Sequence, residues 1–232
     1  MATAPILGTS PAPLLVTSVE GDQCVVLRAV GWAGYRALLR LRGEKSVPRM
    51  TYLDGDLWLM SPSFSHERLA ERLGLFVMVV VEELDIPCTP AGHTTFRRKK
   101  TRGGVEGDKT FYLANEGRIR GKENIDLRFD PPPDLAIEAV YTHGAAPAVE
   151  VWRRFRVPEI WACDEDRLRI LAIGADGRYA ESGMSIAFPF LTATEVFEWV
   201  SRPQTCSETD WIKDVRRWVR KVLVRRVGGQ GD

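Results

Sequence analysis

Two acidic residues in short β-type segments are the side chains of this chain best suited to chemistry. Asp108 stands in Gly-Val-Glu-Gly-Asp-Lys-Thr-Phe-Tyr, and Glu138 ends Pro-Pro-Pro-Asp-Leu-Ala-Ile-Glu. Carboxylates on neighbouring strands can hold Mg²⁺ or Mn²⁺, with water and phosphate oxygens as the other ligands. Such an ion activates water and neutralises charge on a phosphodiester. The pattern therefore suggests a divalent-metal site at Asp108 and Glu138.

A purely structural role for both acids is the alternative. Asp108 would then be an acid at the start of a strand, and Glu138 a buried acid in an ion pair. Burying a carboxylate without a partner inside the apolar segment 135–140 is costly, so Glu138 needs either a partner or a function.

His66 and Glu67 form a second candidate, at the predicted start of a long helix after Ser-Pro-Ser-Phe-Ser. A helix N-terminus favours anions, so these residues could face a phosphate or add a further carboxylate to the metal site. Both are therefore candidate catalytic residues. The alternative is an ordinary helix cap and a solvated charge.

Clustered basic residues supply a third candidate, a surface for the phosphate backbone of DNA. The cluster that precedes Asp108 comprises Arg97, Arg98, Lys99, Lys100 and Arg102. A second basic run lies on one face of the predicted C-terminal helix. A charge run can also be an ordinary solvated face, and of the two runs the one beside Asp108 is the better candidate for nucleic-acid binding.

The elements that must position these residues can be predicted from local patterns. A helix over residues 31–42 ends at Gly43, which suits a helix C-terminus. Strands 49–53 and 56–60 form a hairpin, because Asp54-Gly55 suits a type I′ turn in which both central residues have positive φ.

The longest predicted helix begins near His66 and stops before Pro87. Ser63 or Ser65 caps its N-terminus. One face must be buried, because apolar residues follow helical spacing: Leu69, Leu73, Phe76, Val77, Val80 and Leu84.

The second half of the chain alternates strands and helices. The predicted strands are 94–100, 108–113, 135–140, 159–163, 168–173 and 178–181, and the predicted helices are 147–155, 194–201 and 210–227. Strand 135–140 is apolar apart from Glu138, which is typical of a central strand buried on both faces. We therefore predict an α/β domain over residues 24–200. Residues 1–23 are expected to form a loose N-terminal arm, and 201–232 a basic C-terminal helix and tail.

The composition is that of an ordinary soluble protein, with 44% apolar and 27% charged residues. The net charge is +1, so DNA binding requires a local basic patch. The four cysteines are scattered, without a C-x-x-C pair, and are predicted to be reduced and mostly buried. The longest apolar run is too short to cross a bilayer, and the N-terminus is unlike a secretory signal. We therefore expect a cytoplasmic protein.

Several of these motifs, in this order, resemble those of the Uma-two type restriction endonucleases, a family within the PD-(D/E)xK nuclease superfamily. The resemblance covers roughly residues 49–190. It rests on Tyr-Leu-Asp-Gly-Asp-Leu-Trp-Leu-Met-Ser-Pro-Ser (52–63) with His66, Glu-Gly-Asp-Lys-Thr-Phe-Tyr (106–112), Pro-Pro-Asp-Leu-Ala-Ile-Glu (132–138), Val-Pro-Glu-Ile-Trp (157–161) and Arg-Tyr (178–179). It implies a restriction-endonuclease-like core, a mixed central β-sheet flanked by α-helices, with Mg²⁺-dependent cleavage of DNA.

The resemblance also implies that Asp108 and Glu138 are the metal ligands, but the expected lysine is missing. In the superfamily it stands two residues after the second acid, where this chain has Val140. In the family it often lies on the following helix, where this chain has Ala148. Such a cation orients the attacking water and stabilises the transition state, and its loss typically costs roughly 10²–10⁴-fold in rate.

Three other cations could replace the lysine. Lys109 follows Asp108 directly, and strand alternation should turn it to the opposite face. Arg153 or Lys99 could substitute only if the fold brings it within reach.

Two functions are consistent with the sequence. The first is a Mg²⁺-dependent DNA endonuclease, for which a homodimer would suit the cutting of both strands. The second is a catalytically inactive protein of the same fold that binds nucleic acid or another partner. Convergence of Asp108 and Glu138, with a Lys or Arg nitrogen within about 4–6 Å, would distinguish them.

Overall fold

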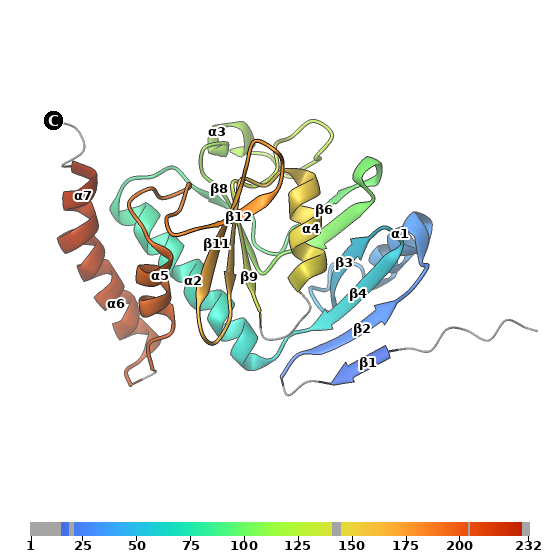
Figure 1. Cartoon of the computed structure of the whole chain (residues 1–232), viewed down its shortest axis with the longest axis horizontal. Helices are drawn as coiled ribbons and strands as arrows, with labels where there is room; N and C mark the ends of the chain where they lie inside the picture. Colours follow the sequence, from blue (N-terminus) through green and yellow to red (C-terminus); the bar gives the residue numbers. More distant parts are fainter. Residues whose placement is uncertain (1–14, 19–20, 141–144, 204, 229–232) are drawn as a thin grey trace, which may run out of the picture.

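The computed structural model describes residues 15–18, 21–140, 145–203 and 205–228, which contain two six-stranded sheets flanked by helices (Figure 1). Every neighbouring pair of strands in the first sheet is antiparallel. Its strands, in spatial order, are β1 (Leu15–Ser18), β2 (Gln23–Leu27), β4 (Asp56–Ser61), β3 (Arg49–Leu53), β7 (Gly103–Glu106) and β6 (Thr95–Arg98).

The second sheet is mixed, because β9 and β10 run parallel and the other neighbours are antiparallel. Its strands, in spatial order, are β12 (Tyr179–Ser182), β11 (Leu168–Ile173), β10 (Glu159–Cys163), β9 (Leu135–Ala139), β8 (Lys109–Tyr112) and β5 (Thr89–Pro90). All five residues of β9 are buried between β8 and β10, as predicted for the central strand. The predicted α/β fold with a mixed sheet is confirmed. The predicted hairpin β3–β4 is also present, and in the first sheet it pairs with β2 on one side and β7 on the other.

The helices lie on the faces and ends of these sheets (Figure 1). They are α1 (Gly31–Arg42), α2 (Phe64–Glu83), α3 (Glu116–Ile119), α4 (Ala145–Phe155), α5 (Ala193–Val200), α6 (Glu208–Trp218) and α7 (Val224–Gly228), with a short 3₁₀ helix at Lys99–Thr101 and a π-helical turn at Val219–Leu223. The single C-terminal helix that the sequence predicts is thus interrupted by the π turn. No helix of the described residues is long and apolar enough to cross a membrane.

The predicted signals at helix ends and turns have the expected geometry. Gly43 ends α1 with a φ of 65°. Asp54 and Gly55 have φ values of 53° and 112°, as a type I′ turn requires. Ser63 caps α2, because its hydroxyl accepts a hydrogen bond from the backbone N–H of His66 at 3.2 Å.

The prediction of a loose N-terminal arm is wrong for two parts of that segment. Leu15–Ser18 form β1, whose backbone pairs with β2, because an extended apolar and β-branched segment can extend the edge of the sheet. Asp22 is buried rather than solvated. The remaining residues of the predicted arm, 1–14 and 19–20, lie outside the described part of the chain.

The prediction of mostly buried cysteines is also wrong. All four are free, as predicted, but only Cys163 is buried, and Cys206 is exposed. Cys163 points into the core from a central strand, whereas Cys206 lies in the connection that precedes α6.

One core lies between α2 and the second sheet. It contains Phe76 of α2, Ile137 of β9 and Trp161 of β10, together with Val196 of α5 and Val215 of α6. Each such side chain contributes about 1.5–3 kcal/mol when fully buried. This core holds α2, and therefore His66 and Glu67 in its first turn, against the second sheet.

A second core lies around α4, between the two sheets. Val151 and Trp152 of α4 pack with Phe96 and Val105 of the first sheet and with Ala136 of β9. Figure 1 shows α4 between the strands of the two sheets. The helix therefore fixes the position of one sheet relative to the other, and the candidate site lies where they meet.

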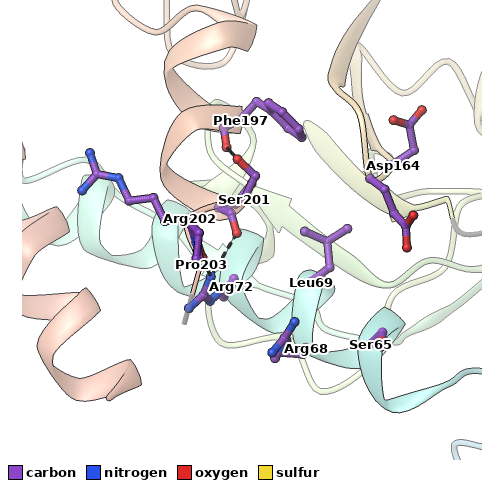
Figure 2. A pocket seen from close by; sticks show the side chains of 11 residues that line it. Ser65, Arg68, Leu69, Arg72, Asp164, Phe197, Ser201, Arg202 and Pro203 are labelled. Atoms are coloured by element: carbon purple, nitrogen blue, oxygen red, sulfur yellow. Dashed lines mark hydrogen bonds between the residues drawn. The ribbon is translucent and has the colours of Figure 1, made fainter. Parts of the chain in front are cut away.

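Arg72 attaches the C-terminal helices to α2. Its guanidinium donates hydrogen bonds to the carbonyls of Val200 and Arg202 and to the carboxylate of Glu208. Figure 2 shows Arg72 at the end of α5, beside a cavity of about 210 Å³. This buried arginine has backbone and carboxylate partners outside the candidate site.

Candidate active site

The chain passes from the first sheet to the second at Gly107 and Asp108, the two residues between β7 and β8. A Cβ atom at Gly107 would lie 2.8 Å from Cζ2 of Trp152 and 3.2 Å from Oε1 of Glu138. The indole of Trp152 is fully buried and cannot move away easily. A glycine at this point therefore allows the close approach that places Asp108 directly before β8.

Asp108 and Glu138 lie opposite each other on neighbouring antiparallel strands. Lys109 pairs with Ile137, and continuing this register by one residue places Asp108 beside Glu138. Directly opposite residues of such a pair point to the same face, with Cβ atoms roughly 4.5–5.5 Å apart. Oδ2 of Asp108 also accepts a hydrogen bond from the backbone N–H of Ala139 at 2.6 Å. The structure therefore brings the two predicted metal ligands together.

Two cations contact the other oxygen of Asp108. Arg49, at the start of β3, donates to Oδ1 from Nη1, and Nε2 of His66 lies 3.0 Å from the same oxygen. Nη2 of Arg49 bonds to Oε1 of Glu67 at 2.6 Å. Nδ1 of His66 lies 2.9 Å from Oδ2 of Asp22. The network joins the first sheet, α2 and the β7–β8 crossing through buried ion pairs.

The neighbouring carboxylates favour the charged form of His66, against the positive charge of Arg49, whose Nη1 lies 3.3 Å from Nε2. Burial alone would lower the pKa of His66, but the hydrogen bond and charge of Asp108, together with Asp22, raise it to about 9. For Asp108, burial alone would raise the pKa. His66, Arg49 and the backbone N–H of Ala139 outweigh burial and hold the pKa of Asp108 below its usual range. Near neutral pH, Asp108 is therefore ionised and His66 is protonated.

Glu138 has a different environment. Its Oε1 accepts a hydrogen bond from Nε1 of Trp152 at 2.5 Å. Burial, followed by the negative charge of Asp108, raises the pKa of Glu138 to about 8. Of the two neighbouring carboxylates, Asp108 therefore carries the charge and Glu138 is protonated near neutral pH.

The cation beside this pair comes from a position that the sequence did not suggest. Lys109 extends to α2, where Nζ lies 2.5 Å from Oε1 of Glu71, whereas Glu138 contacts α4 on the other side of the sheet. Arg153 bonds to Glu150 and to the carbonyl of Gly177. Arg49, which contacts Asp108 directly, meets the requirement for a nearby Lys or Arg nitrogen.

The basic cluster extends away from the carboxylates, although it is close to Asp108 in sequence. In the β6–β7 hairpin Thr95 pairs with Glu106, whereas Arg98 pairs with Gly103. The basic end therefore lies three residues, roughly 10 Å, along the strands from Glu106. Arg97, Arg98 and Lys99 line a cleft of about 780 Å³, whereas Arg102 forms an ion pair with Asp54. Arg98 also donates to the carbonyl of Leu127.

Sequence reasoning missed Arg49 and Asp22. Both are buried, and a buried charged residue is a signal for a function or a strong partner. Arg49 begins a strand in which Met50 and Tyr52 are apolar, and nothing in that pattern singles Arg49 out as a buried charge. Asp22 was assigned to the loose arm. Their partners lie at a sequence separation that local patterns cannot detect.

Comparison with known proteins assigns the family. The chain matches the family model described as "Uma2: Putative restriction endonuclease" over residues 32–204. It belongs to this family. The resemblance seen in the motifs is thereby confirmed. One similar solved structure is described as a putative nuclease from Anabaena variabilis; it is 14% identical, with a TM-score of 0.48, and the alignment covers 69% of this chain and 96% of that chain. No curated protein matches the chain.

The two carboxylates of the candidate site form a donor set that fits a hard divalent ion. Mg²⁺ and Mn²⁺ bind carboxylate oxygens, and Mg²⁺ is commonly held by one or two of them. Asp108 and Glu138 supply such a pair. Burial, and then the negative charge of Asp108, raise the pKa of Glu138, and a bound cation would favour its ionised form. A cation at Oδ1 of Asp108 would compete there with Arg49 and His66.

Proposed function

We propose that this Uma2 protein is a Mg²⁺- or Mn²⁺-dependent endonuclease that hydrolyses DNA phosphodiester bonds, with Asp108 and Glu138 as metal ligands. The observation that supports this most directly is the cross-strand pair itself. Two buried carboxylates share one face, and Glu138 has a pKa raised to about 8 by burial and by Asp108. A bound divalent ion would stabilise both carboxylates as anions and would activate water for attack on phosphorus.

Arg49 takes the role of the missing lysine in this proposal. Its guanidinium, unlike an ammonium, can bond to two carboxylates at once, and it does so with Asp108 and Glu67. Held in this way, Arg49 can neutralise charge that develops on the phosphate. His66 is a positioning residue, because its two ring nitrogens contact Asp22 and Asp108.

The cleft along β6 supports a path for the DNA backbone. Its lining includes the basic residues Arg36, Arg97, Arg98, Lys99 and Arg128, with Glu123 and Asp126 as the acidic ones. The lining also includes Thr94 and Thr95, and Thr95 pairs with Glu106, two residues before Asp108. DNA bound in the cleft would therefore extend toward the carboxylates, and its binding would weaken as salt concentration rises.

Plasmid cleavage tests the proposal. We expect the protein to nick or cut plasmid DNA with Mg²⁺ or Mn²⁺, and Asp108→Asn or Glu138→Gln to abolish cutting. Glu159→Gln is the matched control, because Glu159 is also a buried strand residue bonded to an indole, that of Trp161. Its variant should lose stability but keep the cutting activity. Equal residual cutting by all three variants would contradict the assignment of Asp108 and Glu138.

A second candidate function is a catalytically inactive nuclease fold that binds nucleic acid. Two observations favour it: Asp108 already has Arg49 and His66 as partners, and the carboxylates are only 1% and 8% exposed. Calorimetry separates the two functions. Salt-dependent DNA binding, with the same heat of divalent-ion binding in Asp108→Asn as in the unaltered chain, would favour the inactive protein.

A further inference from the structure

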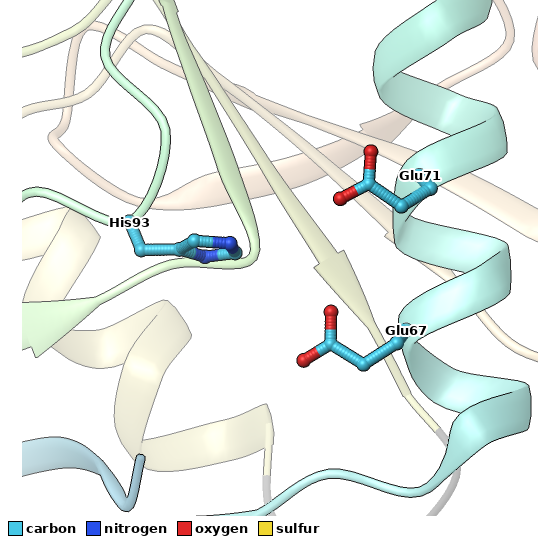
Figure 3. Close-up of side chains that lie close together, drawn as sticks. All are labelled: Glu67, Glu71 and His93. Atoms are coloured by element: carbon cyan, nitrogen blue, oxygen red, sulfur yellow. The ribbon is translucent and has the colours of Figure 1, made fainter. Parts of the chain in front are cut away.

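Two glutamates of α2 and a histidine of a distant loop converge beside the candidate active site. Glu67 and Glu71 are one helical turn apart, and His93 belongs to the loop between β5 and β6. One ligand atom from each residue lies within 4.8 Å of the other two. Figure 3 shows the imidazole of His93 extending toward the two carboxylates. The convergence joins elements that the sequence separates by more than twenty residues.

The distances are close to those of a metal site. Ligands held at about 2.1 Å from one ion lie roughly 3 Å apart at right angles and about 4.2 Å apart across it. A separation of up to 4.8 Å therefore requires only a small movement. Side-chain rotation suffices for this, because Glu67 and Glu71 have partly exposed side chains.

His93 is oriented as a ligand by a partner outside the cluster. Its Nδ1 lies 3.3 Å from the carbonyl oxygen of Gly107. A carbonyl only accepts, so Nδ1 carries the proton and the lone pair is on Nε2. A hydrogen bond from the second ring nitrogen to a carbonyl is the usual support of a metal-bound histidine. Gly107 directly precedes Asp108, so this support comes from the β7–β8 crossing.

The ion pairs of the two glutamates leave room for a cation. Arg49 contacts Oε1 of Glu67, and Lys109 contacts Oε1 of Glu71, so the Oε2 atoms lie outside these pairs. The side chain of Glu71 is 56% exposed, whereas that of Lys109 is only 15% exposed. The Glu71 carboxylate can therefore keep Oε1 near Lys109 while Oε2 binds an ion, and Arg49 keeps its bond to Asp108.

We propose that Glu67, Glu71 and His93 form a second divalent-metal site, distinct from the Asp108–Glu138 pair. Two carboxylates and one imidazole suit a first-row transition ion such as Mn²⁺ or Zn²⁺ better than Mg²⁺, which rarely takes nitrogen ligands. The site adjoins the first, because Arg49 lies between Glu67 and Asp108. The proposal stands whether or not the protein cuts DNA.

Titration of the full chain with Mn²⁺, without DNA, tests this site. Electron paramagnetic resonance counts the free ion and gives the number of bound equivalents. Glu71→Gln and His93→Ala should each weaken one class of site at least roughly tenfold. Glu82→Gln is the matched control, because Glu82 is also an exposed glutamate of α2 paired with a basic residue. Its side chain is 63% exposed, and its variant should bind Mn²⁺ like the unaltered chain.

Asp108→Asn separates the two sites. It should remove the equivalent held by Asp108 and Glu138 while leaving the one that depends on His93. Circular dichroism shows whether each variant is folded, and the exposed position of Glu71 keeps its variant folded. Identical Mn²⁺ binding by Glu71→Gln, Glu82→Gln and the unaltered chain would overturn the proposal. A loss caused by His93→Ala alone, with Glu71→Gln unchanged, would also overturn it.

Discussion

Replacement of Arg49 by methionine separates the structural and the catalytic role of this buried cation. Arg49 is 4% exposed and forms ion pairs with Asp108 and Glu67. Removing one partner of a buried ion pair costs about 3–5 kcal/mol, because the other charge is left without compensation. His66 remains on Asp108 in the variant, so we expect the lower value, about 3 kcal/mol. With a slope of about 2 kcal/mol/M, the urea midpoint falls by about 1.5 M.

Arg72→Met supplies the control for stability. Arg72 is similarly buried and bonded, but its partners are Glu208 and two carbonyls outside the site. Both variants should therefore lose stability in urea, whereas only Arg49→Met should lose plasmid cutting, by roughly 10²–10³-fold. Cutting is measured well below both urea midpoints. If Arg49→Met cuts as fast as Arg72→Met, Arg49 has no part in the transition state.

Two further predictions concern the crossing and the histidine. Gly107→Ala should lower the free energy of unfolding, measured by chemical denaturation, by about 1–3 kcal/mol, because its Cβ would lie 2.8 Å from the buried Trp152. Gly117→Ala is the control, because there is open space around Gly117. Equal stability of both variants would contradict the close approach at Gly107. In EDTA, charged His66 stabilises the fold fully below its ordinary pKa of 6.5, and this contribution is lost as pH rises through about 9. The melting temperature should therefore fall more over this pH range than it does in His66→Gln, and parallel curves would show that His66 is not charged in the fold.

Local elements of this chain could be predicted because their signals are local. The turn at Asp54-Gly55 and the cap at Ser63 depend on residues within a few positions of each other. The buried face of α2 follows from helical periodicity, and the central strand β9 from its apolar character. The strand β7 was missed, because Gly103 and Gly104 give no strand pattern. Its conformation depends on pairing with β3 and β6, which is a tertiary effect.

The candidate site could be predicted only in part, for the same reason. Asp108 and Glu138 were recognised from their surroundings in the sequence, and the register of β8 against β9 brings them together. Arg49 reaches Asp108 from a different sheet, 59 residues away, so no local pattern could select it. The orientation of the His93 ring depends on its hydrogen bond to the carbonyl of Gly107, which no local pattern indicates. The basic cluster was preferred as a DNA-binding surface because it is close to Asp108 in sequence. In the fold it extends away from Asp108 along β6.

Burial and the negative charge of Asp108 account for the raised pKa of Glu138, and the charges around the pair show what a bound cation would change. Four carboxylates and two cations form the network: Asp22, Glu67, Asp108 and Glu138 with Arg49 and His66. Four negative and two positive charges leave a net charge of −2 when every group is ionised. Burial makes a second negative charge beside Asp108 costly, and the raised pKa of Glu138 favours its protonated form near neutral pH. A single divalent cation would balance the same excess, and Glu138 would then release its proton. Metal binding to this site should therefore release a proton near neutral pH, and the binding heat measured in two buffers of different ionisation enthalpy should differ accordingly.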